Sequence, residues 1–263
     1  MKATMPPTKP PIIGTAFAAW ADAFRMIAAM PLVIGIALAI DFALSLAGLL
    51  VMPDPLALAA SRLYAALIIV VSAVLSAVLF APLAIVTHRF VLLGETTNRY
   101  PLDPFSARYV RFVGFAILFK LALVLPNTLS NLASLLLHDQ IMTTVFGLAI
   151  AVLTIAMFIV TVRRIILFPA IAVDAPGATW SNARRDTKGS SWRVLFIFAL
   201  TAVPELIVSA LIGVATVSPE LKIGWQAIYL VGPLVWIPTI CAFAAAASHI
   251  FRARADSLIG ISR

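Results

Sequence analysis

The sequence predicts an all-α fold: a polytopic membrane bundle of six transmembrane helices with interfacial elbow helices. Three observations lead to this prediction. Of the 263 residues, 62% are hydrophobic and only 11% are charged, whereas soluble domains average about 45–50% apolar and about 25% charged residues. Six apolar stretches are long enough to cross a bilayer, and the basic residues gather on one side of them. We therefore expect lipid, and not water, to be the solvent around most of the chain.

Each apolar stretch meets the requirement of about 20 residues for a spanning helix. The stretches are, in chain order, Pro31–Met52, Leu63–Thr87, Phe112–Leu137, Ile141–Val162, Val194–Val217 and Trp225–Ile250. They are long and lack a period-two polar alternation, which favours helices over membrane strands. The first stretch exceeds the usual apolar region of a signal peptide, about 7–15 residues, so we expect it to be a retained span. Residues 1–11 are rich in proline and are expected to be a disordered leader, and residues 12–263 a single membrane domain.

The basic residues give the predicted orientation. Sixteen of the nineteen Lys and Arg residues fall in the N-terminal segment, the second-to-third and fourth-to-fifth connections and the C-terminal tail. Arg62 and Lys222 fall on the opposite side, and Lys120 lies within a span. Because short basic loops remain in the cytoplasm, we expect a bacterial inner-membrane protein with both termini cytoplasmic.

A short segment that mixes aromatic residues with cations precedes each odd-numbered span, as is typical of helices lying in the membrane interface. These segments are Phe17–Arg25, Phe105–Phe112 and Trp180–Lys188. In the third, Thr179 can cap the helix start and Gly189 can end it. Basic side chains of the second and third elbow regions are expected to contact anionic lipid headgroups: Arg108, Arg111, Arg184, Arg185, Lys188 and Arg193.

The spacing of these elbows suggests three elbow-plus-hairpin repeats. Trp20, Phe105 and Trp180 lie at similar intervals along the chain. Internal repeats are common in membrane proteins that place a polar site between repeat units. Six spans with short outer loops also produce such spacing by topology alone, so both explanations stay open.

Few charges lie inside the spans. Asp41 and Glu205 are expected near mid-bilayer, and Lys120 lies nearer the cytoplasmic side. A charge at the bilayer centre costs about 2.5–3.5 kcal/mol on insertion scales, so such residues normally face the bundle interior or water. At 100° per residue, Asn127 and Asn131 share a face with Lys120. We expect an intramembrane polar cluster of Asp41, Lys120, Asn127, Asn131 and Glu205, which either fixes helix packing or lines a path for a ligand.

The sequence contains no catalytic signature that we recognise. His-Glu-x-x-His and Gly-x-Ser-x-Gly are absent, as are Gly-rich phosphate loops. We expect no enzymatic activity, no cofactor and no metal site, and we interpret His88, His138 and His249 as headgroup contacts at the membrane faces. The net charge is +8, and the basic residues that produce it lie next to the apolar spans. Anionic lipids, and not nucleic acid, are therefore the expected partners.

Two regions carry a family resemblance. The segments His88–Glu95 and Arg164–Asp174, followed by Trp180 and Lys188–Arg193, resemble a family of uncharacterised six-span proteins of alphaproteobacterial inner membranes. That family is distantly similar to the membrane domain that accompanies some glycerophosphodiester phosphodiesterases. The resemblance implies an all-helical membrane domain. The phosphodiesterase barrel and its acidic metal site have no counterpart here, so the resemblance does not imply that activity.

Two functions follow from these observations. The first is a non-enzymatic accessory or assembly subunit that packs against other membrane proteins. The alternative is a small transporter or channel for an ion or a lipid-like amphiphile, with a polar seam between odd-numbered helices. A water-accessible cavity that touches Asp41 and Glu205 favours transport, whereas direct pairing with Lys120 in a dry core favours packing.

Overall fold

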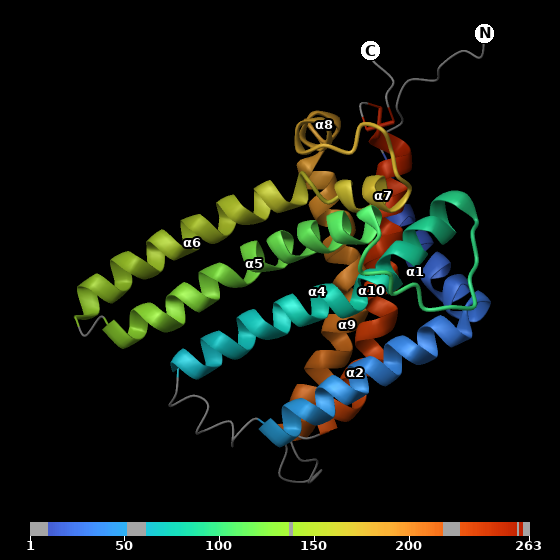
Figure 1. Ribbon diagram of the computed structural model, residues 1–263. Coiled ribbons are helices and arrows are strands. Elements are labelled where there is room, and N and C mark those ends of the chain that lie inside the picture. The colour runs from blue at the N-terminus through green and yellow to red at the C-terminus, as the bar shows by residue number, and fades with distance from the viewer. Residues whose placement is uncertain (1–9, 52–61, 137–138, 218–226, 257, 260–263) are drawn as a thin grey trace.

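The computed structural model describes residues 10–51, 62–136, 139–217, 227–256 and 258–259, and it is helical, with no strand among these residues (Figure 1). The described helices are α1 (Ile12–Ala29), α2 (Pro31–Val51), α4 (Arg62–Leu93), α5 (Ala107–Leu136), α6 (Gln140–Val162), α7 (Leu167–Ala172), α8 (Trp180–Asp186), α9 (Ser191–Val217) and α10 (Ala227–Arg254). Seven of them are long and apolar enough to cross a membrane. The predicted all-α membrane bundle is therefore confirmed.

Each of the six predicted apolar stretches forms one of these long helices, and α1 is the additional candidate. The main differences lie at two helix ends. Helix α4 continues beyond Thr87 to Leu93, and α5 begins at Ala107, before Phe112. The added turns stay helical because they contribute buried side chains to the core, among them Val91 and Tyr109.

Two of the three predicted elbows form helices that are separate from the span that follows them. Residues Phe17–Arg25 lie inside α1, and Trp180–Lys188 contains α8. The Thr179 hydroxyl accepts a hydrogen bond from the Asn182 amide at 3.4 Å, so the start of α8 is as predicted. The helix ends earlier than predicted, with Thr187 as its C-cap, and Gly189, with a φ of +77°, ends the turn that follows. The expected elbow at Phe105–Phe112 is wrong: from Ala107 onward this segment is the first part of α5, because no glycine or proline interrupts the helix there.

Helix α1 is amphipathic and joins α2 through a sharp break. One face buries Ala19, Ala23 and Met26, and α1 packs chiefly against α10 and α9. The other face exposes Phe17, which is 74% accessible. Met30 leaves the helical conformation before Pro31, as expected of a residue that precedes proline, and α1 meets α2 at an angle (Figure 1).

The predicted leader falls largely outside the described part of the chain. Residues 1–9 are among the residues that the structure does not describe. Pro10 is buried, and Pro11 occupies the N-cap position of α1. The helical domain therefore begins at Ile12, with Pro10 already packed against it.

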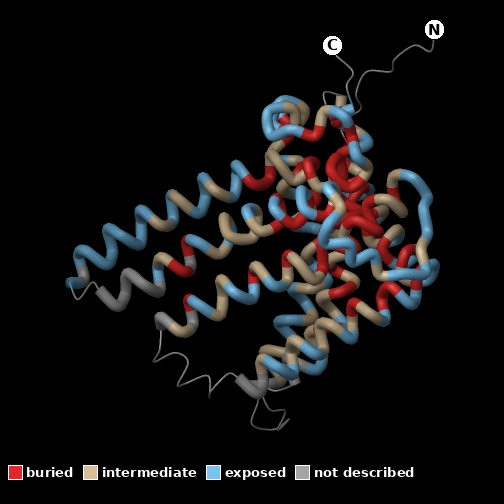
Figure 2. The backbone as a smooth tube through the Cα atoms, viewed as in Figure 1, coloured by how far each residue is buried: buried red, intermediate tan, exposed pale blue. Residues whose placement is uncertain are grey.

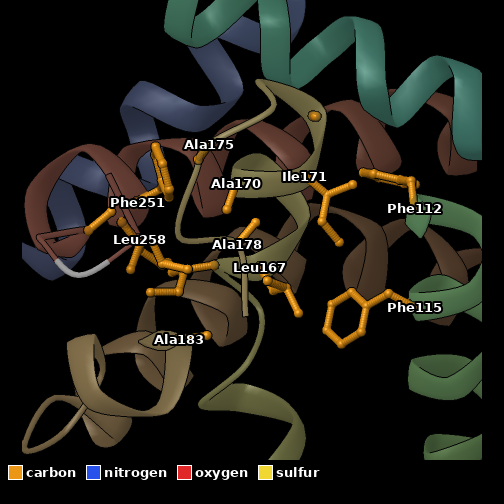
Figure 3. Packing of buried hydrophobic residues seen from close by; sticks show 14 of the residues in the cluster. Phe112, Phe115, Leu167, Ala170, Ile171, Ala175, Ala178, Ala183, Phe251 and Leu258 are labelled. Atoms are coloured by element: carbon orange, nitrogen blue, oxygen red, sulfur yellow. The ribbon is translucent and has the colours of Figure 1, made fainter. Parts of the chain in front are cut away.

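The core lies at the end of the bundle that carries α7 and α8. Buried residues concentrate there, whereas α6 is exposed along most of its length and the described residues in the far halves of α4 and α5 are mostly exposed or half-buried (Figure 2). In the close view of this core, Phe112 and Phe115 of α5 approach Leu167 and Ile171 of α7 (Figure 3). The helices are therefore packed tightly against one another at this end, and less tightly along their other halves.

Helix α7 was not predicted, because we assigned this region only to the basic connection between the fourth and fifth spans. Ile166, Leu167 and Ala170 are buried in the main core cluster. An apolar run from Ile165 to Ala172 interrupts the charges of this connection. The run is too short to span a bilayer, but it is long enough for a short helix that packs against the core at the end of the bundle. An apolar run between charged residues could therefore have predicted this helix.

The contacts between helices differ from those of the three separate hairpins suggested by the sequence. Helix α4 packs most extensively against α5, whereas α2 contacts α10 more than it contacts α4. Helix α10 touches α1, α2, α4, α7 and α9, and its Ala242, Ala245 and Ala246 are fully buried. Small residues allow such close approach of membrane helices. The first two spans therefore do not form the expected tight hairpin, because α10 lies at the centre and takes up the contact surface of α2.

Two tyrosines stabilise a proline turn in α4. Pro82 has no N–H, so the carbonyl four residues earlier, that of Val78, loses its helical donor. The hydroxyl of Tyr109 donates to Val78 O at 2.8 Å, and that of Tyr100 donates to the adjacent Leu79 O at 2.6 Å. Side chains outside α4 thus satisfy the backbone that Pro82 disturbs.

We expect Tyr109→Phe to lower the free energy of unfolding by about 1–3 kcal/mol, because it leaves the carbonyl of the half-buried Val78 unpaired. In a Pro82→Ala background the amide of residue 82 can bond this carbonyl, and the same substitution should cost far less. Unfolding in mixed micelles, followed by circular dichroism, measures this double-mutant cycle. An equal cost in both backgrounds would show that Tyr109 acts through packing instead.

Candidate functional site

A pocket between α2, α9 and α10 contains the two acidic residues of the predicted cluster. Its volume is about 460 Å³. The lining residues are Asp41, Ser45, Glu205, Ser209, Ile212, Gly213, Gly232, Pro233, Val235 and Trp236. Asp41 and Glu205 are both half-buried. Two carboxylates from distant parts of the sequence therefore face one cavity.

The helical repeat explains how the polar groups reach the pocket. On α2, Ser45 follows Asp41 by four residues, and on α9, Ser209 follows Glu205 by the same interval. Residues four apart lie on one face of a helix. Each helix thus presents a carboxylate and, one turn further, a hydroxyl to the same cavity.

Helix α10 supplies the third wall, which the sequence did not lead us to expect. Gly232, Pro233 and Trp236 line the pocket. A Cβ built on Gly232 meets nothing within 4 Å, so the glycine leaves open space on this wall. The Gly-Pro pair interrupts an apolar stretch, and such pairs mark local breaks. That signal was present in the sequence, but it does not say which other helices the break faces.

Lys120 lies outside this pocket. Its ammonium group donates to the hydroxyl of Ser76 on α4 at 2.5 Å, and within the described ranges it forms no salt bridge with Asp41 or Glu205. The third odd-numbered span, α5, therefore turns its lysine toward α4. The observed polar site joins the first, fifth and sixth spans instead of the three odd-numbered ones.

The two asparagines of the predicted cluster cannot be assigned to it. Asn127 and Asn131 belong to α5, but their side chains fall outside the described part of the structure. Their neighbour Thr128 is buried and donates to the carbonyl of Val124 at 3.0 Å.

The charged groups that line the pocket are both acidic, and Lys120 acts on Asp41 only from a distance, without contact. No lysine or arginine of the described chain lines it, whereas Asp41 and Glu205 both do. An ionised carboxylate within the bilayer costs several kcal/mol unless a counter-charge, water or a proton compensates it. The cavity is therefore suited to a cation or a proton.

The basic residues predicted to contact headgroups divide into two groups. Arg108 forms a bidentate pair with Asp174, which holds the pKa of that carboxyl below its usual value, and Arg111 donates to Ala178 O at 3.1 Å. Both therefore make contacts within the protein. The exposed members of the predicted set are Arg111, Arg184, Arg185 and Lys188, whereas Arg108 and Arg193 are half-buried.

Two histidines take part in helix packing, which differs from the expected headgroup role. His88 is 2% exposed and its Nδ1 lies 2.8 Å from the Ser248 hydroxyl. His249 Nε2 lies 2.9 Å from a carboxylate oxygen of Asp22. They join α4 and α1, respectively, to α10. His138 falls outside the described residues.

Across the described ranges, no group of three or more His, Cys, Asp or Glu side chains is arranged to hold a metal ion. Comparison with family models, curated proteins and solved structures finds no match. The residues of this chain are therefore the whole basis for assigning the pocket.

Proposed function

We propose that this integral membrane protein is a small transporter that binds a cation in the pocket between α2, α9 and α10. The single observation that carries the proposal is that Asp41 and Glu205 line one cavity and that neither carboxylate contacts Lys120. This is the arrangement expected for transport and not for a structural acid–base cluster.

The size and chemistry of the cavity support a small ligand. Its volume of about 460 Å³ falls within the usual range of ligand pockets, about 300–1,000 Å³. Asp41 and Glu205 can accept hydrogen bonds from an ammonium group, and Trp236 offers an aromatic ring beside them. Carboxylates and aromatic faces both attract cations. An ion, a proton or the amine headgroup of an amphiphile fits this chemistry.

We place the protein in the bacterial inner membrane with both termini cytoplasmic, and α1 along the cytoplasmic interface. Two observations support this orientation. The exposed cations of α8 lie at the core end of the bundle, where short basic segments remain cytoplasmic. The amphipathic faces of α1 match a helix lying in the interface, which leaves six crossings.

Glu205→Gln tests the proposal. We expect it to abolish flux while leaving membrane abundance unchanged or higher, because the amide keeps the shape of the side chain and removes a carboxylate that costs about 2.5–3.5 kcal/mol in the membrane. Purified protein in liposomes is assayed for fluxes of protons, sodium ions and methylammonium, and abundance is measured by immunoblot.

Asp139→Asn is the matched control. It also removes one carboxylate, but at the exposed N-cap of α6, where asparagine caps equally well, so it should transport like the wild type. Loss of Glu205→Gln from the membrane would indicate a packing role. Flux that survives this substitution would also contradict the proposal.

An accessory or assembly subunit is the second candidate, and helix α6 favours it. Its residues Ile141–Leu148 are exposed, and α6 packs mainly against α5. Such a helix offers an apolar face to another membrane protein. Co-purification in mild detergent of a stoichiometric partner, lost on substitution of Phe146 but retained in Glu205→Gln, would support this candidate.

A further inference from the structure

Arg164, in the turn after α6, lies against an exposed aromatic ring. Its guanidinium carbon is 4.5 Å from the centroid of Trp180, and the indole is 45% exposed. One guanidinium nitrogen, Nη1, donates to Val160 O at 3.2 Å. The Nε atom is buried and has no hydrogen-bond partner. An unpaired buried donor is costly, so an acceptor that reached Nε would stabilise this guanidinium.

A second guanidinium raises the positive potential at this place. Burial lowers the pKa of Arg164, and the neighbouring charge of Arg184 lowers it further. In the part of the chain that the structure describes, neither arginine forms a salt bridge. Two positive charges therefore lie close together at this place.

The surroundings of Arg164 are apolar. Trp180 packs edge-on against Phe115 with ring centroids 5.7 Å apart, and Phe115 packs on Phe168 at 4.5 Å. Val160, the hydrogen-bond partner of Arg164, belongs to the last turn of α6, which exposes Phe158 and Ile159. A charged group bound at Arg164 would thus lie beside a helix surface suited to hydrocarbon chains.

We propose that Arg164, Arg184 and Trp180 bind the phosphate of an anionic phospholipid in the adjacent leaflet. The guanidinium groups match phosphate oxygens in charge and hydrogen-bonding geometry, and an amphipathic ring such as that of Trp180 suits contact with headgroups. The apolar end of α6 accommodates an acyl chain. Free phosphate would gain only the polar half of these contacts, so the site is assigned to a lipid.

Native mass spectrometry of the full chain in detergent tests this site. The protein is titrated with phosphatidylglycerol, with phosphatidylcholine of the same chains, and with inorganic phosphate as competitor. We expect one phosphatidylglycerol to bind more tightly than phosphatidylcholine and to resist competition by millimolar phosphate. Arg164→Gln and Arg184→Gln should each weaken this binding about tenfold, which corresponds to ~1.4 kcal/mol.

Arg99→Gln is the matched control because it removes the same charge from an exposed position that was not predicted to contact headgroups, and it should change affinity by less than about twofold. Equal losses in all three variants would overturn the proposal in favour of diffuse attraction. Displacement of the lipid by inorganic phosphate, or equal binding of the two phospholipids, would also overturn it. Arg184 is exposed, so its variant remains informative if Arg164→Gln fails to fold. None of these outcomes depends on transport.

Discussion

Gly232→Leu should block transport without harming the fold. Gly232 lines the acidic pocket, and a Cβ at this position meets no atom within 4 Å. A leucine side chain would therefore extend into the cavity beside Asp41 and Glu205 and occupy space that the cation needs. Helix stability should not suffer, because leucine favours the helix over glycine by roughly 0.5–1 kcal/mol.

The expected result is a fall in flux of about tenfold or more, since one blocked site removes the binding contacts together. Flux into liposomes is compared at equal protein content, with helicity checked by circular dichroism. Gly147→Leu is the matched control: Gly147 is exposed on α6 and also has open space around its Cα. If both variants transport normally, the pocket does not lie on the route.

Ala246→Leu should cause a large loss of stability. Ala246 is fully buried in the core cluster on α10, the helix that contacts five others. Three added carbon atoms would separate helices that approach closely only because these side chains are small. Overpacking of this kind costs about 1–3 kcal/mol, and more where the backbone cannot shift.

Thermal unfolding in detergent measures this effect, with monodispersity checked by gel filtration. Ala151→Leu makes the same change at an exposed position of α6. Because both residues are strong helix formers, that variant should unfold at the wild-type temperature. A wild-type unfolding temperature for Ala246→Leu would mean that α10 is less tightly packed than the structure indicates.

The six spans could be predicted because their signal is local. A run such as Ile141–Val162 contains enough apolar residues to require lipid on its own, and α6 has nearly these bounds. The cap at Thr179 and the positive φ of Gly189 were also predictable, since each depends on a few neighbouring residues. The buried helix α7 was missed because an apolar run of that length carries no spanning signal.

The membership of the polar site could be predicted only in part. Asp41 and Glu205 were identified from their cost in lipid, and both line one pocket. Lys120 was identified by the same argument but faces Ser76. The cost of a charge says that a residue must find polar surroundings and does not say which helix will provide them.

The sequence by itself determined that this chain is a helical membrane protein, where its spans run, and which residues a bilayer makes costly. Only the tertiary structure decided which helices meet: α10 at the centre, α2 and α9 around one acidic cavity, and Arg164 against Trp180. The physical reason is that hydropathy and helix periodicity act over a few turns. The choice of neighbours depends on the fit of whole helix surfaces, and buried residues such as Ala246 contribute to that fit only through their small size.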